Sequence, residues 1–176
     1  MSSEIKNIKY CYVVLQIALV FLCSFSSEML FSQPALPQRS ITVTATQPFN
    51  FGTFTTGGTG GTVTIGFDGS RSSTGAVFLL SMVPTAQPAI FEVKLCEGRN
   101  VSITFSPSTI LTGSNGGTLT MEIGPTEKGP SGSVFPTISD CNFVTPMRVG
   151  GTLIIPSGNV IPGTYTGSFE ITFNQE

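Results

Sequence analysis

Carboxylate side chains come closest to a catalytic set in this sequence, because it contains no histidine. A Ser–His–Asp triad, a Cys–His nucleophile pair and a histidine-ligated zinc site are therefore excluded. The chemistry that remains is that of a secreted hydrolase such as a glycosidase, which needs two carboxyl groups roughly 5–10 Å apart. The candidate carboxylates are Asp68, Glu92, Glu122, Asp140 and Glu170.

The surroundings of these carboxylates in the sequence favour structural roles. Glu92, Glu122 and Glu170 each alternate with apolar neighbours, and a period of two is typical of the solvent face of a strand. Asp68 and Asp140 stand in predicted loops, where a carboxylate either contributes to a calcium site or caps a turn. We favour the turn cap, and we predict no catalytic residue, no cofactor and no metal site.

The cysteines are the second chemically reactive group. Cys96 and Cys141 have no second cysteine three positions away, so a redox-active pair is not expected. Two cysteines without histidine also make a poor metal site. In an exported chain they are predicted to form a disulfide, which would stabilise the fold by about 4 kcal/mol on the chain-entropy model. The alternative is two buried free thiols.

Two further motifs are weak. The glycine-rich segment 57–61 lacks the Lys-Ser/Thr pair and the helix of a phosphate-binding loop, and we interpret it as a hairpin tip. Asn100-Val101-Ser102 has the form of a glycosylation site, which matters only in a eukaryotic secretory pathway.

Residues 1–32 are predicted to be a secretory signal peptide. Two lysines precede Tyr10–Phe25, an uncharged run of about 16 residues, which is shorter than the ~20 that span a membrane. Small polar residues follow the run, and cleavage after Ser26 or Ser32 fits them; we favour Ser32. The alternatives are an uncleaved anchor and a lipoprotein attached at Cys23. We therefore expect an exported protein of the periplasm, cell surface or medium, with no membrane span in the mature chain.

The length and composition characterise the domain that is predicted to remain after the signal peptide is removed. The 176 residues allow one domain, predicted to be residues 41–176 behind a short polar lead at 33–40. Charged residues make up 10% of the chain and its net charge is −2, against a usual ~25% charged. Nucleic acid is not expected as a partner, because its binding needs a basic stripe.

The elements that must position any site are predicted to be strands. No segment of ten residues shows a helical period, whereas short alternating or apolar segments recur between glycine- and proline-rich turns. This pattern predicts an all-β fold, an antiparallel sandwich. The predicted strands are 41–46, 49–54, 62–67, 76–82, 90–96, 101–105, 109–111, 118–123, 148–155 and 164–173.

Some placements follow from this pattern. The nearly continuous apolar segment 76–82 is predicted to lie in the middle of a sheet. Segments 90–96 and 101–105 are predicted to form a hairpin around Gly98–Asn100. Residues 124–146, rich in proline and glycine, are predicted to be a long loop with one short strand, held by Cys141.

The turns and their flanking strands resemble a bacterial family of secreted domains, known as domain of unknown function 4402. The resemblance covers residues 40–176 and is carried by four segments. They are Ser40–Phe54 (SITVTATQPFNFGTF), Gly60–Ile65 (GGTVTI), Gly69–Gly75 (GSRSSTG) and Val149–Phe173 (VGGTLIIPSGNVIPGTYTGSFEITF). It implies a pilin-related, immunoglobulin-like sandwich without enzymatic activity. The cysteine pair and the stretch 124–146 depart from the family pattern.

The pilin likeness directs attention to the C-terminal strand. Pilins that a chaperone and usher assemble end in an alternating strand, with a glycine fourteen residues from the end and a penultimate aromatic residue. Here Gly163 has that spacing, but the last aromatic is Phe173. In such assembly a partner's strand adds to an exposed sheet edge. The candidate strand-addition tail comprises Gly163, Tyr165, Phe169, Ile171 and Phe173, which share one face with Gly167.

The donor of such a strand is less obvious. Segment 33–40 contains two prolines, which disfavour a regular strand, so a donor would have to be Ile41–Thr46. We favour a self-contained sandwich over donor-strand assembly.

We expect a non-enzymatic structural protein of the envelope or surface, with a pilus-like subunit as one form. Its partners would be copies of itself or a related subunit. The alternative is an adhesive or carbohydrate-binding module that uses Tyr165, Phe135 or Phe143 against surface glycans.

Overall fold

The computed structural model describes residues 41–95, 99–138, 140 and 142–176. All regular structure in these residues is β-strand. The predicted signal peptide, the lead at 33–40 and the cysteines at 96 and 141 lie outside the described residues. The strands are β1 (Thr42–Gln47), β2 (Thr53–Ile65), β3 (Arg71–Leu80), β4 (Ala89–Lys94), β5 (Asn100–Phe105), β6 (Ser108–Gly113), β7 (Thr118–Thr126), β8 (Val134–Pro136), β9 (Thr145–Ile155), β10 (Tyr165–Thr166) and β11 (Ile171–Gln175).

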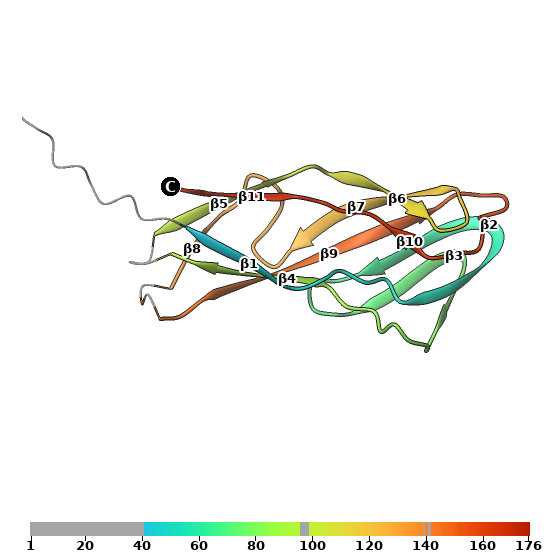
Figure 1. Cartoon of the computed structure of the whole chain (residues 1–176), viewed down its shortest axis with the longest axis horizontal. Coiled ribbons are helices and arrows are strands. Elements are labelled where there is room, and N and C mark those ends of the chain that lie inside the picture. The colour runs from blue at the N-terminus through green and yellow to red at the C-terminus, as the bar shows by residue number, and fades with distance from the viewer. Residues whose placement is uncertain (1–40, 96–98, 139, 141) are drawn as a thin grey trace, which may run out of the picture. The chain divides into compact units, whose positions relative to one another are not determined.

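The strands form two antiparallel sheets, as the alternating sequence predicts. The larger, eight-stranded sheet has the order β1-β4-β9-β7-β6-β10, with β2 paired to β9 and β3 paired to β2. The smaller sheet has the order β11-β5-β8. Figure 1 shows the C-terminal chain running back past β6 and β5 through β10 and β11. The fold is thus an antiparallel β-sandwich.

Strand β9 is the centre of the larger sheet. Its first half pairs with β4 and its second half with β2, while β7 pairs along its other edge. Its inward side chains are almost completely buried: Met147 and Val149 are 0% exposed, and Leu153 and Ile155 are 2% exposed. Together with Val63, Ile65, Val93, Val101 and Ile103, all 0% exposed, they form the core.

The glycine-rich segment 57–61 is not a hairpin tip, so that prediction is wrong. Strand β2 continues through it, with a bulge between Thr56 and Gly61, and the chain reverses later, at residues 66–70. Glycine is required here by close approach to β3. A Cβ on Gly61 would lie 2.1 Å from the Thr74 carbonyl oxygen, and one on Gly75 would lie 2.3 Å from the Gly60 carbonyl oxygen. The glycines therefore permit a bulge that keeps the strand paired.

The apolar segment 76–82 does not lie in the middle of a sheet. It forms the end of β3, which pairs with β2 alone among the described strands. Val77 faces the core and is 4% exposed, whereas Phe78 and Met82 are 59% and 61% exposed. Continuous hydrophobicity predicted a strand correctly but assigned it the wrong neighbours.

Strands β4 and β5 do not form the predicted hairpin. Strand β4 pairs with β1 and β9 in the larger sheet, and β5 pairs with β11 and β8 in the smaller one. Both edges of β4 are occupied, so the chain crosses to the other sheet instead of folding back. The side chains alternate along the end of β4 and just after it: Val93 and Leu95 are buried, and Lys94 is exposed.

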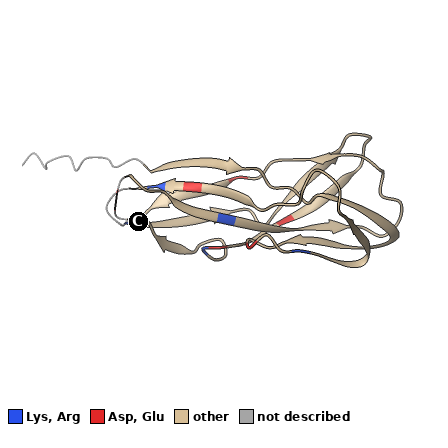
Figure 2. Ribbon diagram, turned by 90° about the horizontal axis from the view of Figure 1, so that it is seen from below, with Lys and Arg blue, Asp and Glu red and all other residues tan. Residues whose placement is uncertain are grey.

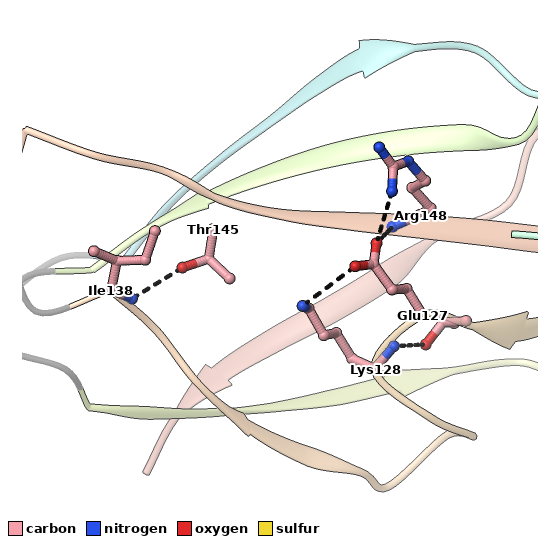
Figure 3. A network of polar contacts seen from close by, with 6 residues as sticks. Glu127, Lys128, Ile138, Thr145 and Arg148 are labelled. Carbon is pink, nitrogen blue, oxygen red and sulfur yellow. Dashed lines mark hydrogen bonds and ion pairs between the residues drawn. The ribbon is translucent and has the colours of Figure 1, made fainter. Parts of the chain in front are cut away.

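The stretch after β7 contains one short strand, β8, as predicted. Ionic and polar contacts attach it to β9 (Figure 3). The Glu127 carboxylate lies 3.7 Å from Arg148 Nη1 and 3.6 Å from Lys128 Nζ, and it accepts a hydrogen bond from the Arg148 amide. Thr145 Oγ1 accepts one from the Ile138 amide at 3.0 Å.

In the described part of the chain, the positions of lysine, arginine, aspartate and glutamate are scattered along the ribbon and form no continuous stripe (Figure 2). In the described part of the chain no helix is long and apolar enough to cross a membrane.

Candidate functional site: an uncharged groove between two sheet edges

The two terminal strands of the larger sheet line one groove. In the order β1-β4-β9-β7-β6-β10, the sheet begins with β1 and ends with β10. Ala45 and Gln47 of β1 and Tyr165 and Thr166 of β10 nevertheless line the same hollow, of about 920 Å³. The sheet therefore curls round until its edges face each other across a gap. Edge strands present unpaired backbone N–H and C=O groups.

The walls of the groove are two segments of extended chain. One runs from Ala45 to Thr56, through the end of β1 and into β2, and the other runs from Val160 to Phe169. The floor is part of the hydrophobic core and is formed by Ala89, Phe91, Leu111, Met121 and Leu153. Ala89, Leu111, Met121 and Leu153 are at most 8% exposed, so on the floor only the half-buried Phe91 offers a substantial surface to the groove.

The groove contains no charged side chain. Its lining consists of apolar residues, glycine, proline, serine, threonine, tyrosine, asparagine and glutamine. An ionic ligand would find no partner charge here, and burying a charge without one is costly. An uncharged occupant with apolar side chains and a backbone able to pair with both walls fits this chemistry.

The first wall is fixed to the larger sheet at Asn50. The Asn50 amide donates to the Gln87 carbonyl at 2.9 Å, and the Gln87 amide donates to the Asn50 carbonyl at 2.8 Å. The Gln87 side chain also donates to the Pro48 carbonyl at 3.0 Å. This reciprocal pair holds the wall independently of β1.

Arg71 fixes the same wall from the other side. Its guanidinium donates to the carbonyls of Thr53 (2.8 Å) and Leu80 (3.1 Å), tying β2 to β3. Burial lowers the pKa of this arginine. The two terminal nitrogens of the guanidinium therefore hold β2 and β3 together. The Nε atom is buried and has no hydrogen-bond partner among the described residues.

The second wall contains the candidate strand-addition tail. Gly163, Tyr165 and Phe169 line the groove, while Ile171 and Phe173 lie farther along, in β11. Tyr165 pairs with Gly113 of β6 and Ile171 with Phe105 of β5, and the other edge of the tail is the edge of a sheet.

The predicted single strand 164–173 is divided into β10 and β11, which belong to different sheets, with residues 167–170 outside regular strand. Its inward side chains are only half-buried. The half-buried members are Tyr165, Phe169, Ile171 and Phe173, between exposed residues. The ring of Phe91 on the floor lies 6.2 Å from that of Phe169 and 6.0 Å from that of Phe173.

Strand β1 is equally uncovered. Residues directly opposite each other in an antiparallel pair point to the same face, and Val43 is opposite Val93. Val93 is 0% exposed, yet Val43 is 36% exposed. The inward face of β1 thus looks into space that no described strand fills.

The sequence missed most of the first wall. Residues 48–52 do not form the predicted strand, and only Asn50 makes an isolated bridge. Phe49, Phe51 and Phe54 all line the groove. Phe49, Phe51 and Phe54 were the available signal, because a regular strand would place Phe54 on the opposite face from the other two.

The candidate carboxylates do not converge. The Asp68 carboxylate accepts hydrogen bonds from the Ser70 hydroxyl (2.6 Å) and amide (3.0 Å), which lower its pKa in that order. The Asp140 carboxylate accepts two from Asn142, at 2.9 and 3.1 Å. Both cap turns, as predicted. No group of three potential metal-ligating residues occurs in the described residues.

The other carboxylates lie on strands. Glu122 and Glu170 are exposed, and Glu92 is half-buried on β4 opposite Thr44. None of the three lines the groove.

Aromatic residues suited to sugar binding are dispersed. Phe135 is 4% exposed, with the Lys128 ammonium 5.9 Å above its ring. The Tyr165 hydroxyl donates to the Ile161 carbonyl at 2.7 Å. Phe143 is 61% exposed and lies outside the groove.

The neighbours of both unplaced cysteines lie close together. Thr137 Oγ1 donates to the carbonyls of Leu95 (3.3 Å) and Arg99 (2.8 Å), which flank the undescribed residues 96–98. On the other side, Val93 pairs with Thr145, four residues after Cys141. Cys96 and Cys141 themselves lie outside the described residues, so their disulfide stays a prediction.

The chain matches a known protein family. The family model described as a domain of unknown function (DUF4402) matches residues 41–174. Searches of the curated proteins and of the solved structures found no match.

Proposed function

This chain belongs to the DUF4402 family, and we propose that it is a non-enzymatic, exported structural protein of the cell envelope or surface. In this proposal it is a fimbria-like subunit whose groove receives a strand from another polypeptide chain. The single observation that carries the proposal is the uncharged groove between β1 and β10, with core side chains on its floor.

Strand addition explains three properties of the groove together: its walls include sheet edges, its lining is uncharged and its floor is apolar. Pairing with a sheet edge supplies main-chain hydrogen bonds, and alternate side chains of the added strand fill the hollow between the sheets. Added apolar side chains would cover the half-buried phenylalanines that line the groove, Phe49, Phe54, Phe91 and Phe169. Covering exposed apolar area stabilises by about 25 cal/mol per Å², so the isolated subunit has a reason to associate.

Export supports the same function. The N-terminal apolar run predicts secretion, and the cysteine pair is suited to an oxidising compartment. The groove lining carries no charged side chain that could bind an ionic substrate. Carbohydrate binding has less support, because Phe135 is buried and the Tyr165 hydroxyl is already bonded.

The test uses the exported protein purified without denaturation. We expect ladders or fibres that resist detergent in the cold and dissociate on boiling. Thr166→Lys should abolish them, because a lysine on an edge strand blocks pairing. The matched control is Thr112→Lys on β6, directly opposite Thr166 but outside the groove.

A wild-type protein that stays a monodisperse monomer would overturn the proposal. Retention of that monomer on a glycan array would favour the carbohydrate-binding module instead.

A further inference from the structure

We propose that Asn115 is a site of spontaneous deamidation, and that the carboxylate formed there loosens the wall of the groove at residues 162–164. The reaction and the loosening concern this chain alone. Their consequence for assembly rests on the proposed function, because it concerns the strand that the groove would receive.

The sequence around Asn115 is suited to this reaction. Asn115 is the only asparagine of the chain that a glycine follows. Deamidation begins when the backbone nitrogen of the next residue attacks the asparagine side chain, and a glycine has no side chain to hinder that attack. Asn115 and Gly116 are both exposed and lie in the turn between β6 and β7. Water therefore reaches the site.

The reaction exchanges an amide for a carboxylate without oxidation or reduction. The Gly116 nitrogen loses its proton to solvent and bonds to Asn115 Cγ; the Cγ–Nδ2 bond breaks, and Nδ2 takes a proton from solvent and leaves as ammonia. Water then opens the cyclic imide at one of its two carbonyls, which gives aspartate or isoaspartate. Either product carries one more negative charge and is about 1 Da heavier than the asparagine form.

One hydrogen bond restrains the attacking nitrogen. The Gly116 amide donates to the Gly113 carbonyl at 3.0 Å, so the reaction proceeds from conformations in which the turn has opened. An exposed turn opens locally at a small cost in free energy. The rate is expected to rise with pH, because the freed nitrogen attacks after it has lost its proton.

The turn that contains Asn115 also holds the second wall of the groove. Asn115 Nδ2 donates to the Pro162 carbonyl at 2.7 Å. The Ser114 amide donates to the Thr164 carbonyl at 2.8 Å, and the Thr164 amide donates to Ser114 Oγ at 3.1 Å. Pro162 and Thr164 line the groove and precede β10. This part of the wall is therefore held by the turn and not by strand pairing.

A carboxylate at position 115 reverses the contact with Pro162. The amide nitrogen donates a hydrogen bond, whereas both oxygens of a carboxylate are acceptors and repel the Pro162 carbonyl. The new charge also lies beside a groove whose lining has none, and covering a charge that has no partner is costly. An incoming strand would meet a looser wall with an unpaired charge beside it.

The first measurement follows the reaction in the full mature protein, stored at mildly alkaline pH and analysed by peptide mapping. We expect Asn115 to convert at least tenfold faster than Asn159. That residue is also exposed and outside the strands, but it precedes Val160, whose branched side chain hinders the attack. Storage at mildly acidic pH should slow the conversion of Asn115. Equal rates at the two asparagines, or an unchanged Asn115, would overturn the deamidation.

The second measurement tests the loosening of the wall in the monomer. Asn115→Asp carries the charge from the start, and Asn174→Asp, on β11 and outside the groove, is the matched control. We expect the Thr164 amide to exchange its hydrogen at least tenfold faster in Asn115→Asp than in wild type, and within twofold of wild type in Asn174→Asp. Urea unfolding checks that both variants fold. Wild-type exchange in Asn115→Asp would contradict the loosening.

The same two variants connect the site to assembly. Asn115→Asp should lower the assembled fraction at least fivefold, and Asn174→Asp should leave it within twofold of wild type. Conversion of Asn115 and fast exchange at Thr164 in a protein that forms no ladders would overturn the proposed function and leave this inference standing. Normal ladders from a protein whose Asn115 does not convert would overturn this inference and leave strand addition standing.

Discussion

Strands β9 and β1 differ in how completely their inward apolar side chains are buried. Strand β9 is paired along both edges, and its inward Met147 and Val149 are 0% exposed. Strand β1 is paired along one edge, and its inward Val43 is 36% exposed although its partner Val93 is 0% exposed. The centre of the domain therefore carries the stability, and in our proposal the groove between β1 and β10 is where another chain associates.

The largest effect on stability is expected from removing the predicted disulfide. Replacing both Cys96 and Cys141 with serine should lower the free energy of unfolding by about 4 kcal/mol, the loop-closure value for a disulfide of this span. Urea unfolding of the exported protein measures it, with the chemically reduced wild type as a control.

The predicted disulfide also changes the mass of the intact protein. The untreated protein should weigh about 2 Da less than the reduced protein, because forming one S–S bond removes two hydrogens. Equal masses would show two free thiols.

Truncation at the centre should cost slightly less. Met147→Ala removes a side chain that is 0% exposed and outside the groove, and such core truncations cost about 3 kcal/mol. The change in urea midpoint measures it. A cost below about 1 kcal/mol would mean that β9 is not the centre of the core.

Truncation in β1 should cost much less. Val43→Ala should change the free energy of unfolding of the monomer by less than about 0.5 kcal/mol, as is usual for exposed positions. The comparison with Met147→Ala in the same urea titration is the direct contrast. A loss comparable to that of Met147→Ala would show that β1 is part of the stable domain.

The smallest effect concerns the turn at Asp68 and depends on pH. Two hydrogen bonds from Ser70 lower the pKa of this carboxyl below 3.8 in the folded state. The stabilisation is therefore present above the unfolded pKa and is lost as the pH falls through the folded pKa. Asp68→Asn should be slightly less stable than wild type near pH 7, and the difference should disappear in strongly acidic urea titrations. A difference that grows on acidification would contradict this.

Much of the fold follows from the sequence, because alternation reports which face a residue occupies. The shared face of Tyr165, Phe169, Ile171 and Phe173, the strands at 109–111 and 118–123 and the turn caps at Asp68 and Asp140 follow from the sequence and agree with the structure. Alternation does not report which strand is the neighbour. For that reason the apolar segment 76–82 was placed inside a sheet instead of at an edge.

The candidate site was only half predictable for a related reason. The tail wall has a regular period, whereas the wall from Ala45 to Thr56 is irregular and is shaped by hydrogen bonds between Asn50 and Gln87, far apart in the sequence. Likewise, the glycines at 57–61 are typical of a turn when only the sequence is known. The position of β3 shows that Gly61 is needed because a side chain there would collide with the Thr74 carbonyl. The absence of charge from the groove becomes visible only when both walls are assembled.

Hydrogen exchange along the strand-addition tail tests the central claim most directly. In the unassembled protein the amides of residues 165–173 should exchange much faster than those of β9, since local opening costs less where one edge has no partner. On assembly they should become as protected as β9. If the amides of residues 165–173 were as protected as those of β9 before assembly, or if their protection did not change on assembly, the proposal that this edge binds another strand would be contradicted.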